Sequence, residues 1–271
     1  MLKIFRDCPK KEYYDFICRN FPWQWGNFNL FKWKHIDDPY REASDFFLIS
    51  ENNQIKALCV GRVYPFVYRG MNYKILSMMD FVTEADSREK GYMTMLSDFI
   101  KEHVSCDFSI GFSSEKLFNT VYKSKNCLQI YYRYEFTSAC VLQNVEPQEL
   151  NIHSFELNPY TFRIIANDEY VHYVKRSCKY EKISLVQDDS LSILIGISGS
   201  SGVLLDISNY SEEACYHAVE MAKPYCKIFQ IDFPNKISAP SSFFVKSTCV
   251  VIDGHFKKDG DRIWIPVLDR K

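Results

Sequence analysis

The segment MDFVTEADSREKGYMTML, residues 79–96, carries the residues whose types and spacing best fit a chemical role. An apolar run gives way to a charged stretch that includes Arg88 and Lys90, and a helical pattern begins directly after Gly91. A glycine loop that enters a helix offers unpaired backbone N–H groups at the positive end of the helix dipole. Such a turn binds phosphate, and two basic side chains add to the attraction. The segment therefore predicts an anion site, with a lone acid, Asp80, upstream of it.

The turn differs from the two commonest nucleotide-binding loops. Gly91 is followed by Tyr92 and Met93 instead of Lys and Ser or Thr, which excludes the P-loop, and the glycine spacing excludes GxGxxG. An ordinary solvated turn is the alternative, because Arg-x-x-Gly at a strand–helix junction is a weak signal alone. Two histidines have similar alternatives: His35 could contact a substrate but is better interpreted as packed or exposed, and His103 is predicted to lie at a helix C-terminus.

Three strand patterns precede the turn and would position Asp80. They are DFFLIS, IKALCVGRVYPFVY and YKILSMMDFV, and the short links ENNQ and RGMN between them favour antiparallel hairpins. After Gly91, YMTMLSDFIKEHV has apolar residues at helical spacing, and CDFSIGF returns to a strand pattern. A strand–helix–strand crossover normally joins parallel strands. The first half is therefore predicted to be an α/β unit with a mixed curved sheet flanked by helices.

The N-terminal segment is less regular. CPKKEYYDFICRNF predicts a short helix, whereas FPWQWGNFNLFKWKHIDDPY is rich in aromatic residues without a clean period. We interpret the second stretch as a cover over the core or as the wall of a pocket.

A boundary is predicted in VLQNVEPQELNIH, which gives one domain over residues 1–145 and a second, smaller α/β domain over residues 150–271. In the second half, helices are predicted after a cap at Asn167 or Asp168 and after Ser211. GISGSSGVLL lies between two strand patterns, so it predicts a hairpin turn instead of a phosphate loop.

Composition limits the function classes. The chain has 271 residues, 46% of them hydrophobic and 16% aromatic, which is enough for a sizeable core. The 33 basic and 34 acidic residues give a net charge of −1, so no basic surface for nucleic acid or an anionic membrane is expected. No apolar run is long enough to cross a bilayer, and the N-terminus lacks a secretion signal. The ten cysteines contain no Cys-x-x-Cys pair, so reduced thiols and a cytoplasmic location are expected, with no metal site.

A family resemblance adds to this interpretation. DFVTEADSREKGYMTMLSDFI resembles the acetyl-CoA-binding motif of the GNAT superfamily of N-acetyltransferases, a strand followed by R/Q-x-x-G-x-G/A and a helix. The likeness is closest to a bacterial subgroup with D-x-x-T-x-P-x-x-R before the loop. Asp80, Thr83 and Arg88 match that pattern. Ala85 replaces its proline, and Met93 stands where many members have Gly or Ala.

A second stretch, IGFSSEKLFNTVYKSKNCLQIYYRYEF, resembles the family's later strand, a helix ending in Y-x-x-x-G-F, and a closing strand. Tyr122 matches the tyrosine, Asn126 occupies the glycine position, and Cys127 replaces the phenylalanine. The resemblance spans residues 40–142. The second half is similar, in element order alone, to the degenerate GNAT-like domain of the subgroup, which would complete an acceptor cleft.

The resemblance implies direct transfer of an acetyl or other short acyl group from acyl-CoA to a primary amine of a small molecule or amino sugar. Acetyl-CoA would be the co-substrate, Asp80 the base, and Tyr122 the proton or hydrogen-bond donor to the departing sulfur. The pantetheine would pair with the backbone of Phe81, Val82 and Thr83, with Val82 N–H as oxyanion donor. The pyrophosphate would lie on the N–H groups of Arg88, Glu89, Lys90, Gly91, Tyr92, Met93 and Thr94.

Acid–base magnitudes constrain these roles. A tyrosine pKa of about 10 against a thiol pKa of about 8.5 makes full proton transfer from Tyr122 uphill by roughly 2 kcal/mol, so a hydrogen bond is the easier role. A lysine-like acceptor would cost about 4–5 kcal/mol to deprotonate at pH 7, and an α-amino group only about 1 kcal/mol. Asp80 can act as base only if burial raises its pKa or if it relays a proton through water. A structural carboxylate is the alternative.

Two other functions stay open at this stage. A non-catalytic acyl-CoA-binding or scaffold protein could keep the same fold, and the residues at Met93, Asn126 and Cys127 favour that alternative. An aminoacyl-transfer enzyme of the peptidoglycan-bridge type also pairs two GNAT-like halves. It would bind tRNA, against which the net charge of −1 argues.

Overall fold

The structure is a computed structural model of the 271-residue chain and describes residues 1–21, 27–114, 127–137, 163–164, 167–177, 179–209, 211–233 and 245–254. The helices are α1 (Lys11–Asn20), α2 (Phe28–His35), α3 (Tyr92–His103), α5 (Asp168–Lys175) and α6 (Glu212–Ala222), with a 3-10 turn, η1 (Ala85–Ser87). The strands are β1 (Leu2–Asp7), β2 (Phe46–Glu51), β3 (Gln54–Tyr68), β4 (Met71–Thr83), β5 (Phe108–Ser114), β6 (Cys127–Thr137), β7 (Arg163–Ile164), β8 (Lys182–Gln187), β9 (Ser192–Ser198), β10 (Ser201–Ile207), β11 (Ile228–Phe233) and β12 (Val245–Gly254).

The strands of the first half have the predicted arrangement. β2, β3 and β4 form an antiparallel meander. α3 then crosses over to β5, which runs parallel to β4 with Ile75 opposite Phe108. The prediction of a mixed α/β sheet with a crossover after Gly91 is therefore confirmed.

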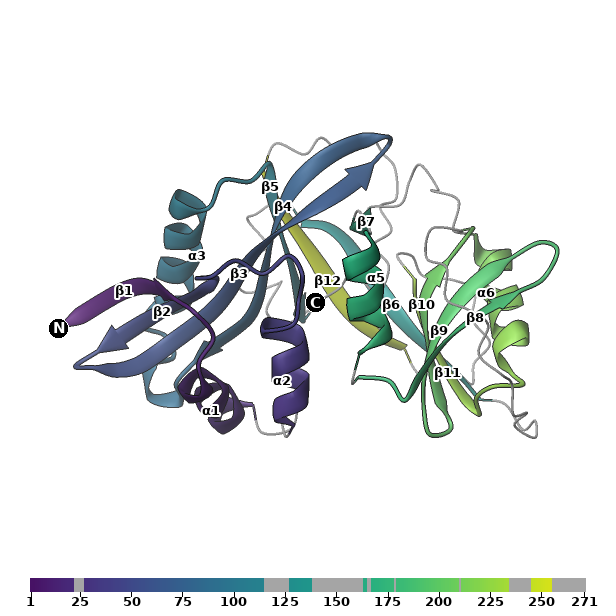
Figure 1. Cartoon of the computed structure of the whole chain (residues 1–271), viewed down its shortest axis with the longest axis horizontal. Coiled ribbons are helices and arrows are strands. Elements are labelled where there is room, and N and C mark those ends of the chain that lie inside the picture. The colour runs from purple at the N-terminus through teal and green to yellow at the C-terminus, as the bar shows by residue number, and fades with distance from the viewer. Residues whose placement is uncertain are drawn as a thin grey trace.

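One sheet runs through the described parts of both halves, in the order β1-β2-β3-β4-β5-β12-β6-β11-β10-β9-β8, with β7 paired to β3 (Figure 1). β12 comes late in the chain but lies between β5 and β6, antiparallel to both. The predicted boundary at residues 145–150 lies outside the described residues, so the division into two domains stays a prediction.

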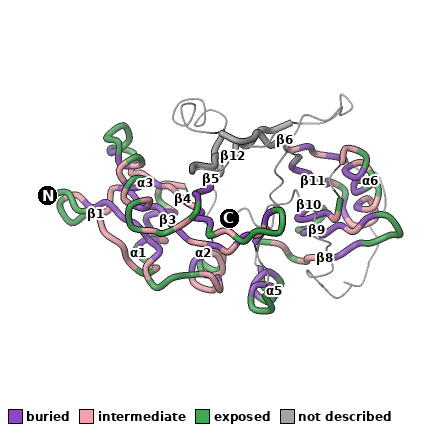
Figure 2. Tube along the Cα trace, turned by 90° about the horizontal axis from the view of Figure 1, so that it is seen from above, coloured by how far each residue is buried: buried purple, intermediate pink, exposed green. Residues whose placement is uncertain are grey.

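Helices cover the two faces of the first-half sheet. α3 buries Tyr92, Leu96 and Ile100, spaced four residues apart, against a cluster that includes Phe47 of β2. At Gly61 of β3 a Cβ atom would lie 3.0 Å from the Phe47 ring and 3.1 Å from Ile100, so the glycine lets α3 pack closely. α1 and α2 contribute to the core of the opposite face, through residues such as Tyr13, Phe16 and Phe31. In a view from above, buried residues follow the strands of both halves (Figure 2).

The two predicted helices and the predicted hairpin of the second half are present, whereas the strand predicted in RIWIPVLD lies outside the described residues. Asn167 caps α5 by accepting a hydrogen bond from the Tyr170 N–H at 2.8 Å, and Ser211 caps α6 by accepting from Ala214 N–H at 3.0 Å. β9 and β10 form the expected hairpin, with Gly199 at a φ of 56° in its turn.

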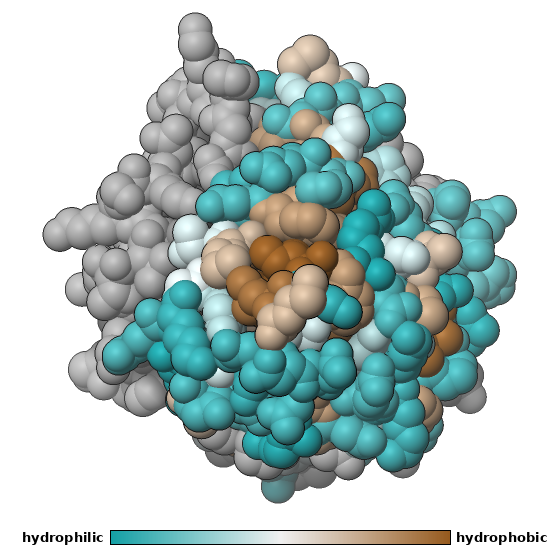
Figure 3. All heavy atoms as spheres, turned by 90° about the vertical axis from the view of Figure 1, so that its left-hand side faces the viewer, coloured by the Kyte–Doolittle hydropathy of each residue, from teal (hydrophilic) through white to brown (hydrophobic). Residues whose placement is uncertain are grey.

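Four elements were not predicted: β1, α2, the short 3-10 turn η1 and the two-residue strand β7. β1 pairs with β2 at the edge of the sheet, and α2 lies within the aromatic stretch that has no clean period. The end of the molecule that carries the N-terminus is largely hydrophilic around one apolar patch (Figure 3). None of the described helices is both long and apolar enough to span a membrane.

Candidate functional site

β4 separates from β5 halfway along its length. The two strands pair only from Ile75 to Ser77, whereas β4 stays paired with β3 up to Thr83. Within the described part of the chain, the segment from Met78 to Thr83 therefore has a strand on one side only. Its other side is a backbone edge with N–H and C=O groups available to a ligand. We call this segment the β4 edge.

A β-bulge lies in the middle of the β4 edge. Leu58 pairs with Val82 and Val60 with Met79, so Cys59 of β3 faces two residues, Asp80 and Phe81. Asp80 takes a φ of 50°, in the left-handed region that few residues other than Gly adopt, although Asp tolerates it better than most. The bulge is thus a locally strained feature at the end of the paired region.

The register determines which amides face outward. The Glu84 N–H donates to the Lys56 carbonyl at 2.9 Å, which makes Thr83 and Ala57 a non-hydrogen-bonded pair. Alternation along the strand then directs the backbone groups of Val82 toward β3 and those of Thr83 toward the β4 edge. The Val82 N–H, expected to be the oxyanion donor, therefore points toward β3. The Thr83 N–H points toward the β4 edge and is the better-oriented donor.

The turn at Gly91 enters a helix directly, as predicted from the sequence. Gly91 directly precedes α3 and has a φ of 75°, and no side chain caps the helix. The Gly91 carbonyl accepts a hydrogen bond from the Met95 N–H at 3.0 Å. The amides of Tyr92, Met93 and Thr94 belong to the first helical turn and have no intrahelical acceptor. Glu89 also has a φ of 75°, so the loop itself adopts an uncommon backbone conformation.

The two basic residues of the turn differ in availability. Lys90 Nζ lies 3.4 Å from the Glu51 carboxylate, which also accepts a hydrogen bond from the Tyr92 hydroxyl at 3.2 Å. Hydrogen bonding and charge from Lys90 lower the pKa of Glu51. Arg88 is exposed and forms no ion pair with any described residue. Arg88 can therefore contact an anion without breaking an ion pair within the described residues, whereas Lys90 would have to leave Glu51.

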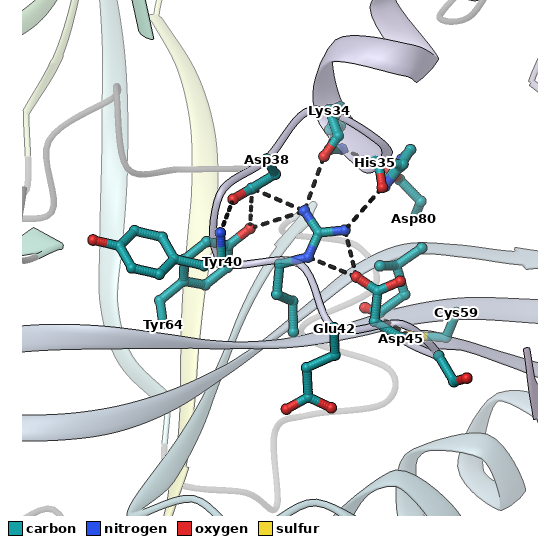
Figure 4. A network of polar contacts seen from close by, with 12 residues as sticks. Lys34, His35, Asp38, Tyr40, Glu42, Asp45, Cys59, Tyr64 and Asp80 are labelled. Atoms are coloured by element: carbon teal, nitrogen blue, oxygen red, sulfur yellow. Dashed lines mark hydrogen bonds and ion pairs between the residues drawn. The ribbon is translucent and has the colours of Figure 1, made fainter. Parts of the chain in front are cut away.

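Asp80 is nearly buried and meets two residues at the C-terminal end of α2. Lys34 Nζ lies 2.8 Å from Asp80 Oδ1, and His35 Nε2 lies 2.9 Å from Oδ2 (Figure 4). The side chains of Lys34, His35 and Asp80 are 15%, 0% and 13% exposed. Burial alone raises the pKa of Asp80, but the charge of Lys34 and the contact with His35 outweigh it and hold that pKa well below its usual value.

His35 is held in its neutral form. Burial lowers its pKa to about 4, against the opposing effect of Asp80. The ring packs on Phe31, with centroids 5.0 Å apart, and on Phe46, with centroids 5.4 Å apart. The interpretation of His35 as a packed histidine is confirmed. His103 is also where it was predicted, with Nδ1 2.8 Å from the Phe99 carbonyl oxygen in the last turn of α3.

A fully buried arginine, Arg62 of β3, fixes the end of α2 (Figure 4). Its guanidinium donates to the Lys34 carbonyl at 2.9 Å and to the His35 carbonyl at 3.5 Å. Asp38 and Asp45 balance its charge, at 2.8 Å and 2.5 Å. Because these carbonyls end the helix, the arginine compensates the negative end of the helix dipole and orients the residues that contact Asp80.

Sequence reasoning found the strand and the turn but missed the residues around Asp80. Lys34 and Arg62 were not identified, because one lies in a segment without periodicity and the other in a strand of apolar residues. Tyr122 lies outside the described residues, so its predicted role stays a prediction. The described residues contain no group of three or more His, Cys, Asp or Glu side chains arranged to hold a metal ion.

Solved structures of GCN5-related N-acetyltransferases share the fold of this chain. A protein from Pyrococcus horikoshii proposed to be an acetyltransferase matches with a TM-score of 0.65 at 10% identity, over 100% of this chain and 96% of that one. A GCN5-related N-acetyltransferase from Kribbella flavida matches with a TM-score of 0.61 at 11% identity, over 92% of this chain and 71% of that one. Its counterpart from Anabaena variabilis gives 0.60 at 11% identity, over 93% and 72%. No protein-family model and no curated protein sequence matches the chain.

Proposed function

We propose that this protein is an acyl-CoA-dependent N-acyltransferase that moves an acetyl or other short acyl group directly to a primary amine of a small molecule or amino sugar. The observation that carries the proposal is the separation of β4 from β5 at Ser77, which leaves the β4 edge open within a sheet of this fold. An extended pantetheine can add to such an edge through main-chain hydrogen bonds. The glycine turn before α3 would take the pyrophosphate.

The proposed roles combine the backbone directions of β4 and the turn with the family resemblance of the sequence. Phe81, Val82 and Thr83 would line the pantetheine, with Thr83 N–H as the donor best directed to an oxyanion. The amides from Arg88 to Thr94 would contact the pyrophosphate, and the Arg88 side chain would add charge. Tyr122 would donate a hydrogen bond to the sulfur as it leaves.

The proton of the amine needs a different account from the one the sequence suggested. A carboxylate whose pKa is held well below its usual value is a weak base at pH 7, and both Asp80 oxygens already face Lys34 and His35. An amine near the pKa of an α-amino group would reach the site partly neutral or lose its proton to water. We therefore propose that Asp80 supports the site instead of accepting the proton.

The direct test has two parts. Mass spectrometry of the purified protein should detect co-purified CoA or acyl-CoA, and calorimetry should show saturable binding of acetyl-CoA. A panel of amines should then yield acylated product. Binding without transfer to any amine would favour the non-catalytic acyl-CoA-binding alternative, and acylation that requires aminoacyl-tRNA would favour the peptidoglycan-bridge type of enzyme.

A variant at Tyr122 tests the leaving-group role. Tyr122→Phe should reduce kcat by roughly a hundredfold or more and change acetyl-CoA affinity by less than about threefold, since the hydroxyl acts when the thiolate forms. Steady-state kinetics and calorimetry on the same preparation separate the two effects. An unchanged kcat would make Tyr122 a packing residue.

A further inference from the structure

The β4 bulge needs support from outside its own strand. Asp80 holds a left-handed φ of 50° in the middle of a strand, a conformation that persists only where surrounding contacts fix it. Its paired neighbours, Met79 and Val82, are buried in the core, so the bulge sits between two anchored positions. Among the described residues, the ion pair of Asp80 with Lys34 at 2.8 Å and its contact with the neutral His35 ring at 2.9 Å both come from α2.

These contacts form a compact clasp, which we define as Lys34, His35 and Asp80. Lys34 Nζ approaches one carboxylate oxygen at 2.8 Å and His35 Nε2 the other at 2.9 Å, so the carboxylate is held from two sides. None of the three side chains is more than 15% exposed. A charged contact shielded from water in this way is much stronger than one on the surface.

The helix that supplies the clasp is itself immobilised. Arg62, in β3, donates hydrogen bonds to the carbonyls of both Lys34 and His35. On the other side, the Trp33 ring stacks on Tyr173 of α5 at 4.8 Å with 4° between the planes, and its Nε1–H donates to the Tyr173 carbonyl at 3.0 Å. Both α5 and the core of the first half therefore fix the position from which α2 reaches β4.

We propose that Lys34 and His35 are positioning residues that act through Asp80 to hold the β4 bulge, and with it the outward direction of the β4 edge, in the form that binds acyl-CoA; this inference rests on the function proposed above. Asp80 is then also a positioning residue. The clasp explains why an ionised carboxylate is placed at the bulge, where it has a structural task that a neutral residue cannot perform equally well.

Three variants separate positioning from acid–base catalysis. Lys34→Met removes the cation at similar side-chain length, and Lys34→Arg keeps it. The double variant Lys34→Met/Asp80→Asn removes both charges, so that no unpaired buried carboxylate remains to prevent folding. Lys32→Met is the matched control, since Lys32 belongs to the same helix and pairs at 2.6 Å with Asp37 on the surface instead of with β4.

Two measurements are made on each protein: the acetyl-CoA Kd by calorimetry, and amide hydrogen exchange over residues 79–84. The clasp predicts that the double variant regains stability relative to Lys34→Met, yet binds acetyl-CoA about tenfold more weakly than wild type. Its amides at the bulge should exchange roughly tenfold faster, with no change in residues 71–75. Lys34→Arg and Lys32→Met should behave like wild type.

The inference would be overturned if the double variant had the same acetyl-CoA Kd as wild type and the same hydrogen-exchange rates over residues 79–84. A third measurement, kcat against pH for wild type and for the single variant Asp80→Asn, tests the base role: the inference also fails if Asp80→Asn keeps the wild-type acetyl-CoA Kd and loses an ascending limb that wild type shows, because Asp80 would then be the base. If wild type itself binds no acetyl-CoA, the proposed function fails, and so does the part of the inference that concerns acyl-CoA. The exchange measurement still decides, independently of acyl-CoA, whether the clasp holds the bulge.

Discussion

At the scale of residues, the first half contains an unusual concentration of buried charge. Arg62, Asp38 and Asp45 have no exposed side-chain surface, and His35 is buried beside them. The two carboxylates balance the arginine, and its remaining donors bind main-chain carbonyls, which is the condition under which buried charges are tolerated. Within this group, burial lowers the pKa of His35 to about 4 and raises the pKa of Asp45.

The buried histidine predicts how stability depends on pH. Its pKa is about 4 in the folded protein against 6.5 unfolded, so below pH 6.5 the unfolded chain binds a proton that the folded chain does not. The free energy of unfolding should therefore fall as the pH drops from about 6.5 to 4, by about 2 kcal/mol between pH 7 and 5 from this group. Two charged groups that face His35 stay ionised over this range, because the pKa of Asp80 is held well below its usual value and the pKa of Arg62 is raised, against the effect of burial, by its neighbours.

Urea unfolding of wild type and His35→Gln at pH 7 and pH 5 checks this expectation. Gln keeps a donor for Asp80 and does not titrate. The stability of His35→Gln should therefore fall less than that of wild type when the pH is lowered from 7 to 5. The control is His103→Gln, which removes an exposed histidine from the end of α3 and should leave the wild-type slope. Equal slopes in wild type and His35→Gln would show that His35 is not held neutral.

The origin of these residue contacts explains why the sequence did not predict them. Asp80 and the glycine turn lie within one short segment, so their types and spacing indicate a site directly. Lys34 and Asp80 are far apart in the chain, and α2 places polar residues on the side that packs inward. A helix whose buried face carries Lys34 and His35 lacks the apolar stripe by which helices are recognised.

At the scale of elements, the turn into α3 is the most sharply defined feature of the candidate site. Its strand, glycine and helix were predicted because each follows from local pattern. The bulge and the outward direction of Thr83 were not, because they depend on pairing between β3 and β4 across the hairpin. Local pattern thus predicted the strand, the turn and the helix, and only the register showed which amides of β4 face away from β3.

Substitution of the turn glycine tests the anion site. Gly91→Val forces a β-branched side chain into a φ of 75°, although nothing lies within 4 Å of its Cβ. We expect the change to distort the first-turn amides and weaken CoA binding by about tenfold or more, with strain of roughly 1–3 kcal/mol. Calorimetry with CoA and urea unfolding provide the two measurements.

Gly70→Val is the matched control for this change. Gly70 has a φ of 74° and equally open surroundings, but it lies in the turn between β3 and β4. It should show a similar loss of stability with unchanged CoA affinity. If both variants bind CoA as wild type does, the glycine turn is a solvated loop and the pyrophosphate site lies elsewhere.

At the scale of the whole molecule, β12 lies between β5 and β6 and so joins the described strands into one sheet. Thr248 pairs with Ser114 of β5 and with Tyr131 of β6, so the strand has a partner on both sides. Residues close to the C-terminus therefore hold together strands from the middle of the chain. The apolar and β-branched residues of SFFVKSTCVVID are typical of a strand, but strand order is a non-local property that the pattern within one segment does not contain.

Proline substitutions test the central position of β12. Every inner N–H of a strand with two partners is within a ladder, so Cys249→Pro should destabilise the protein by about 3 kcal/mol or more. Gln187→Pro is the control: Asp188 N–H donates to the Leu191 carbonyl at 3.0 Å, and alternation along β8 then directs the Gln187 N–H away from β9, at the edge of the described sheet. Thermal unfolding should show a large loss for the first variant and a small one for the second, and equal losses would contradict the strand order.

The same strand has a consequence for how the protein is made. Synthesis proceeds from the N-terminus, so β5 and β6 leave the ribosome well before residues 245–254, and until then each lacks the neighbour it has in the finished sheet. Until β12 is synthesised, we expect β5 and β6 each to have one unpaired strand edge. Such edges recruit chaperones or pair with other chains. A translational pause upstream of Val245 would lengthen that exposure, and completion of the chain would end it.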